Sequence, residues 1–227
     1  MRAFTVDSFD TPPALREDLP TPELGPDQLL IRVQASSVNP VDTGIAAGYL
    51  RAMFPYEFPV ILGRDYAGVI DQVGPAVTGY APGDDVYGWL LHANPTVHDG
   101  SWAELIAVPQ DQSVAHRPAT LDVHQAGAAP LAALTALAAH DALDLGEGAT
   151  VLVVGASGGV GSFAVQLAAR AGPPWLPPAW PRTPTTCAAS ESPRSWTATA
   201  PSSPPCASAP PTGSTPCSTW SPAPRRS

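Results

Sequence analysis

Hydrophobic and polar residues in the first 108 positions follow the pattern of short β-strands. Gln28–Ala35 alternates well enough for a strand with one buried face. Similar short apolar segments, bounded by Gly, Pro or Asp, lie at 1–6, 67–74, 85–88 and 100–108. We expect residues 11–27 to be a Pro-rich surface connection and residues 37–42 to turn the chain. Short strands with frequent Gly and Pro favour a partly open β-barrel over a parallel sheet.

The pattern changes to a helical one after residue 120. Asp122 can cap a helix that runs to Ala129, Pro130 interrupts it, and an alanine-rich helix follows over 131–143. Residues 151–154 then form an apolar run without a polar break, which predicts a strand buried on both faces. After the glycines of 155–161, apolar residues recur every three or four positions, which predicts a helix that covers one face of a sheet.

The glycine-rich turn at 156–161 carries the first candidate chemistry. Its sequence matches G-x-G-x-x-G with alanine in the first place, and it consists of Ala156, Ser157, Gly158, Gly159, Val160 and Gly161. A pyrophosphate needs unpaired backbone N–H groups at a helix N-terminus, and glycines allow the backbone to approach it closely. We therefore expect this turn to bind a dinucleotide. The alternative is a tight strand-to-helix turn with no ligand.

Residues 155–159 also match G-x-S-x-G, the nucleophile elbow of α/β-hydrolases. Such an enzyme needs an acid and a histidine later in the chain. No histidine follows His140, and Glu191 is the only acidic residue after Gly172. The catalytic triad cannot be completed, which excludes this interpretation.

Composition narrows the classes of function. The formal net charge is −9 over 227 residues, with no lysine, which argues against a nucleic-acid surface. We expect no membrane association and a cytoplasmic location, because the sequence has neither a long apolar span nor a signal peptide. All three cysteines, Cys187, Cys206 and Cys217, lie in the last quarter of the chain, so the remainder has no disulfide or thiolate metal site.

Composition also changes abruptly at Gly172. In 173–227, Leu176 is the only residue among Val, Ile, Leu, Met and Phe, and 15 of the 29 prolines fall there. Such a segment cannot bury enough apolar surface to offset its chain entropy, so we expect it to be disordered. The predicted organisation is a barrel domain over 1–120, connecting helices and a first βα unit over 121–172, and a tail over 173–227.

Several segments, in this order along residues 1–172, resemble the medium-chain dehydrogenase/reductase superfamily in its zinc-free, zeta-crystallin-like quinone oxidoreductase branch. They are 37–42 (SVNPVD), 59–69 (PVILGRDYAGV), 82–88 (PGDDVYG), 100–104 (GSWAE), 134–136 (LTA) and the glycine-rich turn. The resemblance implies a mixed α/β chain, with a GroES-like β-barrel followed by the beginning of a Rossmann domain. It also implies hydride transfer from NADPH, with NADH as the alternative, to a quinone or enone.

The resemblance further suggests which residues form the site. It places Asn39, Asp42 and Tyr49 near the nicotinamide and substrate, and Thr135 beside the cofactor. Hydride transfer would then depend on positioning and on hydrogen bonding to the developing enolate. The zinc-dependent branch has Cys near Val38 and Gly-His-Glu at 63–65, where this chain has neither Cys nor His, so no zinc is implied. Residues 39–40 also suit an ordinary turn, and Asp42 an ordinary helix cap.

The resemblance stops after Gly172. If each codon is formed from the third base of one present codon and the first two of the next, 175–180 can become Val-Val-Ala-Thr-Gly-Leu, which resembles the family's second Rossmann strand. The hypothesis is a one-base deletion near the Gly172 codon. The lost segment would include the residue that selects NADPH or NADH, so we expect this chain to be inactive and not to form a family-type homodimer. The alternative is a non-enzymatic interaction protein that presents a barrel and a proline-rich tail.

Overall fold

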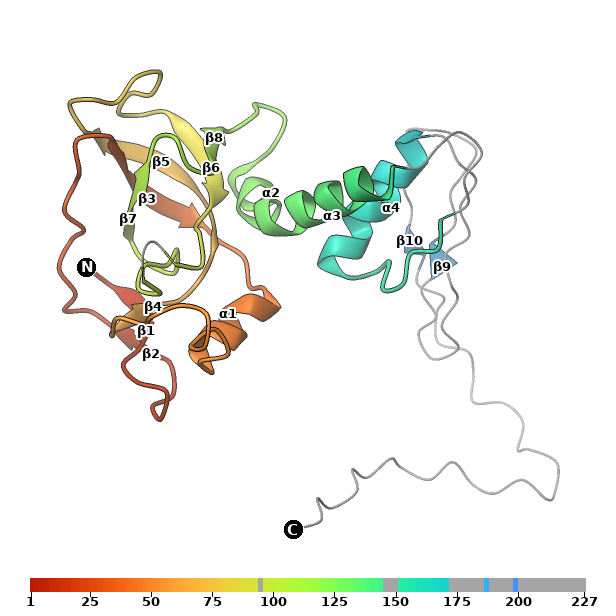
Figure 1. Ribbon diagram of the computed structural model, residues 1–227. Coiled ribbons are helices and arrows are strands. Elements are labelled where there is room, and N and C mark those ends of the chain that lie inside the picture. Colours follow the sequence, from red (N-terminus) through yellow and green to blue (C-terminus); the bar gives the residue numbers. More distant parts are fainter. Residues whose placement is uncertain (94–95, 145–150, 172–185, 188–197, 200–227) are drawn as a thin grey trace, which may run out of the picture. The chain divides into compact units, whose positions relative to one another are not determined.

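The computed structural model describes residues 1–93, 96–144, 151–171, 186–187 and 198–199 (Figure 1). The chain divides into two compact units, Met1–Leu176 and Pro177–Ser227, and each is described here by itself. Within the described part of the chain, no helix is long and apolar enough to cross a membrane.

Eight strands of the first unit form two antiparallel sheets. The five-stranded sheet has the order β7 (Leu105–Pro109), β3 (Gln28–Ala35), β5 (Asp65–Val73), β6 (Asp85–Trp89) and β8 (Val114–His116). The three-stranded sheet has the order β2 (Ala14–Arg16), β1 (Ala3–Val6) and β4 (Val60–Ile61). The predicted β-rich domain of short strands is confirmed, and Gln28–Ala35 has the predicted bounds. The short strands β2, β4 and β8 were not predicted.

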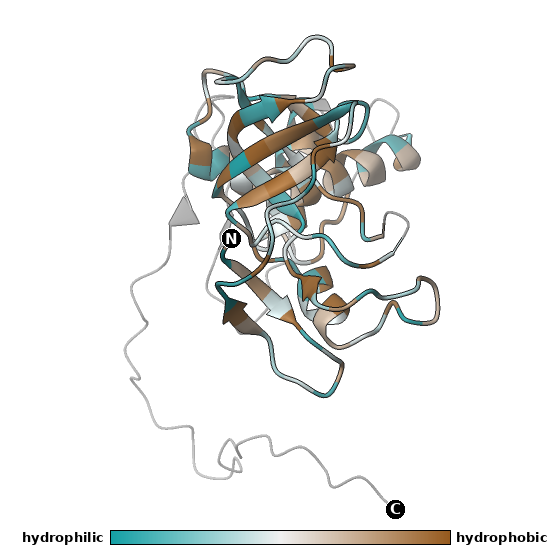
Figure 2. Ribbon diagram, turned by 90° about the vertical axis from the view of Figure 1, so that its left-hand side faces the viewer, coloured by the Kyte–Doolittle hydropathy of each residue, from teal (hydrophilic) through white to brown (hydrophobic). Residues whose placement is uncertain are grey.

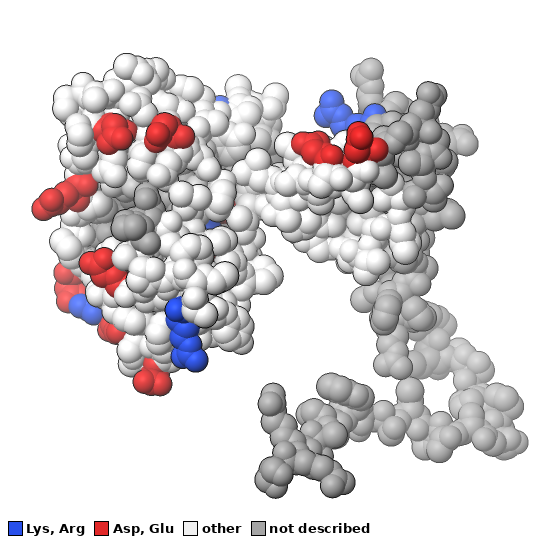
Figure 3. Space-filling model, viewed as in Figure 1, with Lys and Arg blue, Asp and Glu red and all other residues white. Residues whose placement is uncertain are grey.

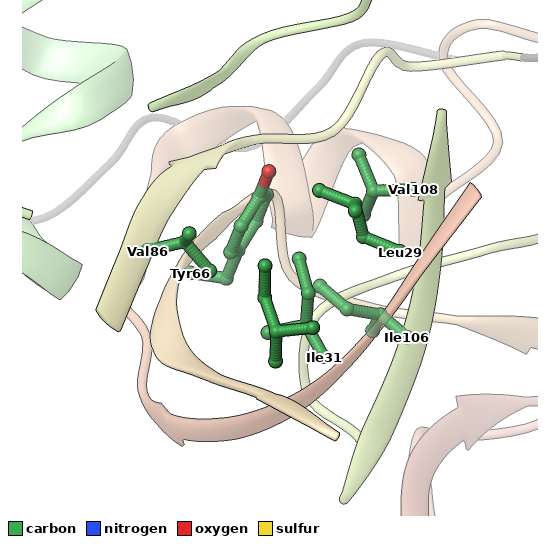
Figure 4. Packing of buried hydrophobic residues seen from close by; sticks show 7 residues of the cluster. Leu29, Ile31, Tyr66, Val86, Ile106 and Val108 are labelled. Carbon is green, nitrogen blue, oxygen red and sulfur yellow. The ribbon is translucent and has the colours of Figure 1, made fainter. Parts of the chain in front are cut away.

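The core of the larger sheet follows the alternation of apolar and polar residues from which its strands were predicted. Along β3, Leu29 and Ile31 point to the same side and are fully buried, because side chains two residues apart share one face of a strand. They pack with residues of the neighbouring strands β5, β6 and β7 into one cluster (Figure 4). Figure 2 shows the matching alternation of hydrophobic and hydrophilic positions along the strands. A second cluster, around Val6, Ile45 and Val60, lies between the smaller sheet and α1 (Pro40–Ala46).

Two helices follow the barrel as predicted. Asp122 caps α2 (Val123–Ala128): its Oδ1 accepts a hydrogen bond from the Gln125 amide at 2.8 Å. The helix approaches the barrel closely, because a Cβ added to Gly127 would lie 2.8 Å from the Ala35 Cβ. The next helix, α3 (Pro130–Leu143), begins at the predicted proline.

The glycine-rich turn leads into α4 (Gly159–Ala171), so the predicted helix is present. The helix contacts α3 (Figure 1), with Val165 and Ala168 buried, rather than a sheet face as predicted. The predicted strand at 151–154 is not formed, and Leu152 and Val154 are 66% and 78% exposed. An isolated strand leaves its backbone N–H and C=O groups without a ladder, and no described strand lies beside this one.

The predicted disorder of 173–227 falls almost entirely outside the described residues. The four residues described there form two short strands, β9 (Thr186–Cys187) and β10 (Ala198–Thr199), paired antiparallel. Strands were not expected in this segment. The pair spans two residues on each side, which is the shortest form of a ladder.

Candidate functional site

Asn39 stands at the N-terminus of α1, and its side chain faces the start of β5. Its amide nitrogen Nδ2 donates to Ser37 Oγ at 2.8 Å and to Asp65 Oδ2 at 2.9 Å. An amide nitrogen has two hydrogens, so both are used. The amide oxygen Oδ1 faces the Asp42 backbone amide in the capping box of α1, and its second lone pair can accept a further hydrogen bond.

Asp42 lies one turn into α1 and is fully buried. Its Oδ2 accepts a hydrogen bond from the Asn39 backbone amide at 2.6 Å, so it acts as the acidic half of a helix cap. Its Oδ1 has no partner within the described part of the chain. Burial raises the pKa of the Asp42 carboxyl group, while the Asn39 amide and the charge of Arg64 oppose this shift. Because the Asp42 carboxyl group is buried and caps α1, it supports the helix and is not accessible to a ligand.

Tyr49 lies in the turn after α1, and its side chain is 78% exposed. Its backbone amide donates to the Gly44 carbonyl at 2.9 Å, which ties the turn to α1. Exposed apolar side chains at Val38 and Met53 lie close to it in sequence. The phenol is therefore accessible and can donate a hydrogen bond to a ligand.

Thr135 lies on the exposed side of α3, and its hydroxyl donates to the Leu131 carbonyl at 2.7 Å. Leu131 also connects this helix to the barrel, because its backbone amide donates to Asp65 Oδ1 at 2.7 Å. The structure therefore joins the Asn39 and Thr135 segments through one carboxylate. The sequence analysis included Asp65 in the 59–69 match and in the comparison of 63–65 with the zinc-dependent branch, but it did not identify Asp65 as a site residue.

Residues 156–161 form the turn and first helical residues of the predicted phosphate site. A Cβ on Gly161 would lie 2.1 Å from the Gly155 carbonyl oxygen, so only glycine allows the helix to pack on the turn. A Cβ on Gly159 would be 3.7 Å from the Ala132 Cβ, which places this turn beside α3. The first amides of α4 lack partners within the helix, as an anion site requires. This part of the turn fits a pyrophosphate, whereas the exposed 151–154 segment does not form the expected strand.

Arg64 occupies the position where the resemblance places a histidine ligand in the zinc-dependent branch. It is 1% exposed and donates to the carbonyls of Leu91, Ile61 and Asp99 at 2.8, 3.1 and 2.6 Å. Burial lowers the pKa of its guanidinium to about 10, so Arg64 remains charged at neutral pH. Its role is to hold three backbone carbonyls, one on β4 and two in loops. No group of three potential metal ligands occurs in the described ranges.

His92, which follows β6, is half-buried. Its ring packs against Trp89 with centroids 6.0 Å apart, and its Nδ1 is buried without a partner in the described residues. Burial, and secondarily the charge of Arg64, lower its pKa.

On the face shown in Figure 3, the described acidic side chains are dispersed rather than gathered into one patch.

The class of protein is indicated by three features: an antiparallel barrel, a connecting helical pair and a glycine-rich turn. Residues 25–119 match the family model of the alcohol dehydrogenase GroES-like domain. These residues form a GroES-like domain of the alcohol dehydrogenase type, and the chain is similar to quinone oxidoreductases of the medium-chain dehydrogenase/reductase superfamily.

Relatives with described activities support this assignment. The chain is 38% identical over 160 residues to a chloroplastic quinone-oxidoreductase homolog of Spinacia oleracea, which covers 66% of this chain and 46% of the relative. It is 36% identical over 156 residues to a chloroplastic NADPH-dependent alkenal/one oxidoreductase of Arabidopsis thaliana, covering 68% and 40%. The chain thus spans about half the length of the curated relatives it matches or less.

The fold is similar to that of solved structures as well. The quinone oxidoreductase from Coxiella burnetii superposes with a TM-score of 0.69 at 32% identity, covering 78% of this chain and 56% of that one. The similarity therefore extends beyond the barrel into the helical segment and the glycine-rich turn.

Proposed function

We propose that the barrel is the substrate domain of a zinc-independent, NAD(P)H-dependent oxidoreductase that transfers hydride to a quinone, enone or similar carbonyl compound. The observation that carries the proposal is the Asp65-centred network, which joins the Asn39 segment to the start of α3 and so to Thr135. The names of the relatives support this substrate class. NADPH, with NADH as the alternative, would supply the hydride.

The side chains suggest a division of roles. Asn39 offers an acceptor, because both of its amide hydrogens are used within the protein. A developing enolate needs a donor, and the exposed phenol of Tyr49 is the candidate for it. Thr135 and the first amides of α4 would contact the cofactor, the latter at its pyrophosphate. Asp42 would support this arrangement by capping α1 rather than by contacting the substrate.

We further propose that this chain does not turn over substrate as it stands. The exposure of Leu152 and Val154 supports this, because the sheet that would hold a dinucleotide lacks its first strand. The composition of 173–227 supports an altered reading frame after Gly172. Isothermal calorimetry with NADPH should detect no micromolar binding. Micromolar affinity would contradict the proposed inactivity, and stop codons in the alternative frame would contradict the frameshift.

The activity itself requires a chain in which the codons after residue 172 are translated in the alternative frame. We expect this protein to oxidise NADPH when 2-cyclohexenone or a benzoquinone is added. Tyr49→Phe should lower kcat about 10- to 100-fold through loss of a donor to the enolate. Tyr87→Phe, on β6, serves as the matched control. If the frame-restored protein binds NADPH but reduces neither compound, the proposed function is wrong.

A further inference from the structure

Asp65 is the first residue of β5 and is fully buried. Its carboxylate accepts hydrogen bonds from three groups: Ser37 Oγ, Asn39 Nδ2 and the Leu131 backbone amide. Among the described residues it forms no ion pair. A buried carboxylate is costly unless donors satisfy it, so these three contacts determine whether the residue is tolerated there.

The carboxylate also determines the direction of the Asn39 amide. The oxygen and nitrogen of an amide group have nearly the same shape, and only the hydrogen-bonding partners distinguish the two orientations. An ionised carboxylate only accepts, so Nδ2 must face Asp65. The Asn39 Oδ1 then faces away from Asp65, toward the Asp42 backbone amide of the capping box, and keeps a second lone pair for a ligand donor.

The second carboxylate oxygen connects the barrel to α3. It accepts the Leu131 amide at 2.7 Å, in the first turn of a helix that begins at Pro130. The amides of a first helical turn have no partner within the helix, and the helix dipole favours a negative charge there. One turn further along, Thr135 donates to the carbonyl of the same Leu131. The position of Thr135 relative to Asn39 therefore depends on Asp65.

We infer that Asp65 is a positioning residue. It orients the Asn39 amide so that its oxygen is presented to a ligand donor, and it docks the N-terminus of α3 against the barrel. Asp65 itself is buried and contacts no ligand. The consequence for a ligand rests on the proposed function, whereas the orientation and the docking can be measured without it.

The experiment uses the full chain labelled with ¹⁵N, and it follows hydrogen exchange at the Leu131 amide and at the Asn39 side-chain amide. Asp65→Asn replaces one carboxylate oxygen with an NH2 group. The hydrogens of this group then face the donor groups of the residues that contacted that oxygen. We expect exchange at Leu131 or at the Asn39 side chain to accelerate roughly ten- to hundredfold, while the Ile31 amide in the barrel core remains protected. Asp71→Asn is the matched control, because Asp71 lies on the same strand but pairs with the exposed Arg32.

Ser37→Ala separates the two halves of the inference. It removes a partner of both Asn39 and Asp65 but leaves the Leu131 contact, so only the Asn39 side chain should exchange faster. This variant also decides the matter if Asp65→Asn does not fold. Equal acceleration at Ile31 and Leu131 in Asp65→Asn would show a general stabilising role and overturn the inference. Unchanged exchange at the Asn39 side chain in Ser37→Ala would overturn it as well.

A titration of the wild-type chain with 1,4-hydroquinone, the reduced form of a benzoquinone whose hydroxyl groups can donate to Asn39 Oδ1, separates this inference from the proposed function. Shifts at the Asn39 side chain that are weakened in Ser37→Ala would support both. If no shift occurs in the wild type, the result counts against the proposed substrate, and the exchange data alone judge Asp65.

Discussion

Two apolar stretches, Gln28–Ala35 and residues 151–154, have similar strand-forming composition but different outcomes. The first forms β3, the strand between β5 and β7, with Leu29 and Ile31 fully buried. The second forms no strand, and two of its four side chains are more than half exposed. The difference lies in their surroundings, because β3 has antiparallel partners on both sides whereas the described residues supply none for 151–154.

An apolar run therefore specifies a strand only together with its neighbours. The helix after the glycine-rich turn formed because its backbone hydrogen bonds are internal to the segment. A strand satisfies its backbone groups only through other strands. The strands of the barrel find all of their partners within residues 3–116.

The largest effect that we expect is on the barrel itself. Arg64→Met removes the donors to three backbone carbonyls and should lower the free energy of unfolding by about 3–5 kcal/mol, because buried acceptors lose charge-assisted hydrogen bonds. Urea unfolding followed by tryptophan fluorescence measures it. Arg32→Met is the control, because Arg32 forms an exposed ion pair with Asp71 that contributes about 0–1 kcal/mol. If both variants lose the same stability, the buried guanidinium does not organise the loops.

A smaller and more local effect is expected at the glycine-rich turn. Gly161→Ala places a Cβ against the Gly155 carbonyl and should destabilise α4 by about 1–3 kcal/mol while the barrel stays intact. Hydrogen exchange should show faster exchange over 159–171 and no change at Ile31. Gly159→Ala is the control, because its Cβ would meet only an ordinary contact. Loss of protection in the barrel would show that the two regions fold as one unit.

The smallest effect concerns pH. The pKa of Asp42 is raised by burial in the folded state, so the folded protein holds this proton more tightly than the unfolded chain. The associated stability is fully present below the unfolded pKa of about 4 and is lost as pH rises through the folded pKa. Asp42→Asn should remove this loss, so the variant gains relative to the wild type between acidic and neutral pH. If the free energies of unfolding of Asp42→Asn and of the wild type differ by the same amount at every pH in this range, the prediction is wrong.

Much of the fold could be predicted from residues that act locally. The alternation in Gln28–Ala35, the Asp122 cap and the break at Pro130 each determine structure within a few neighbouring positions, and each prediction was confirmed. The strands β2 and β4 could not be predicted, because each has only two or three residues and exists through pairing with β1. The helix α1 was missed because residues 37–42 were interpreted as a turn.

The candidate site divides in the same way. The sequence suggested Asn39, Asp42, Tyr49, Thr135 and the turn at 156–161, and their functional roles remain predictions. Their spatial relation required the structure, because Ser37, Asp65 and Leu131 are far apart in the chain and meet at one carboxylate. A hydrogen bond between residues 65 and 131 leaves no periodic signal in a sequence.

The sequence alone determined the β-rich character of the barrel, the helical pair, the glycine-rich turn and the family resemblance, because these follow from local patterns and from motifs in a fixed order. Only the tertiary structure decided which way the Asn39 amide points, that Asp42 is buried, and that 151–154 stays without a strand. The physical reason is that hydrogen-bond direction, desolvation and strand pairing depend on partners distant in the chain.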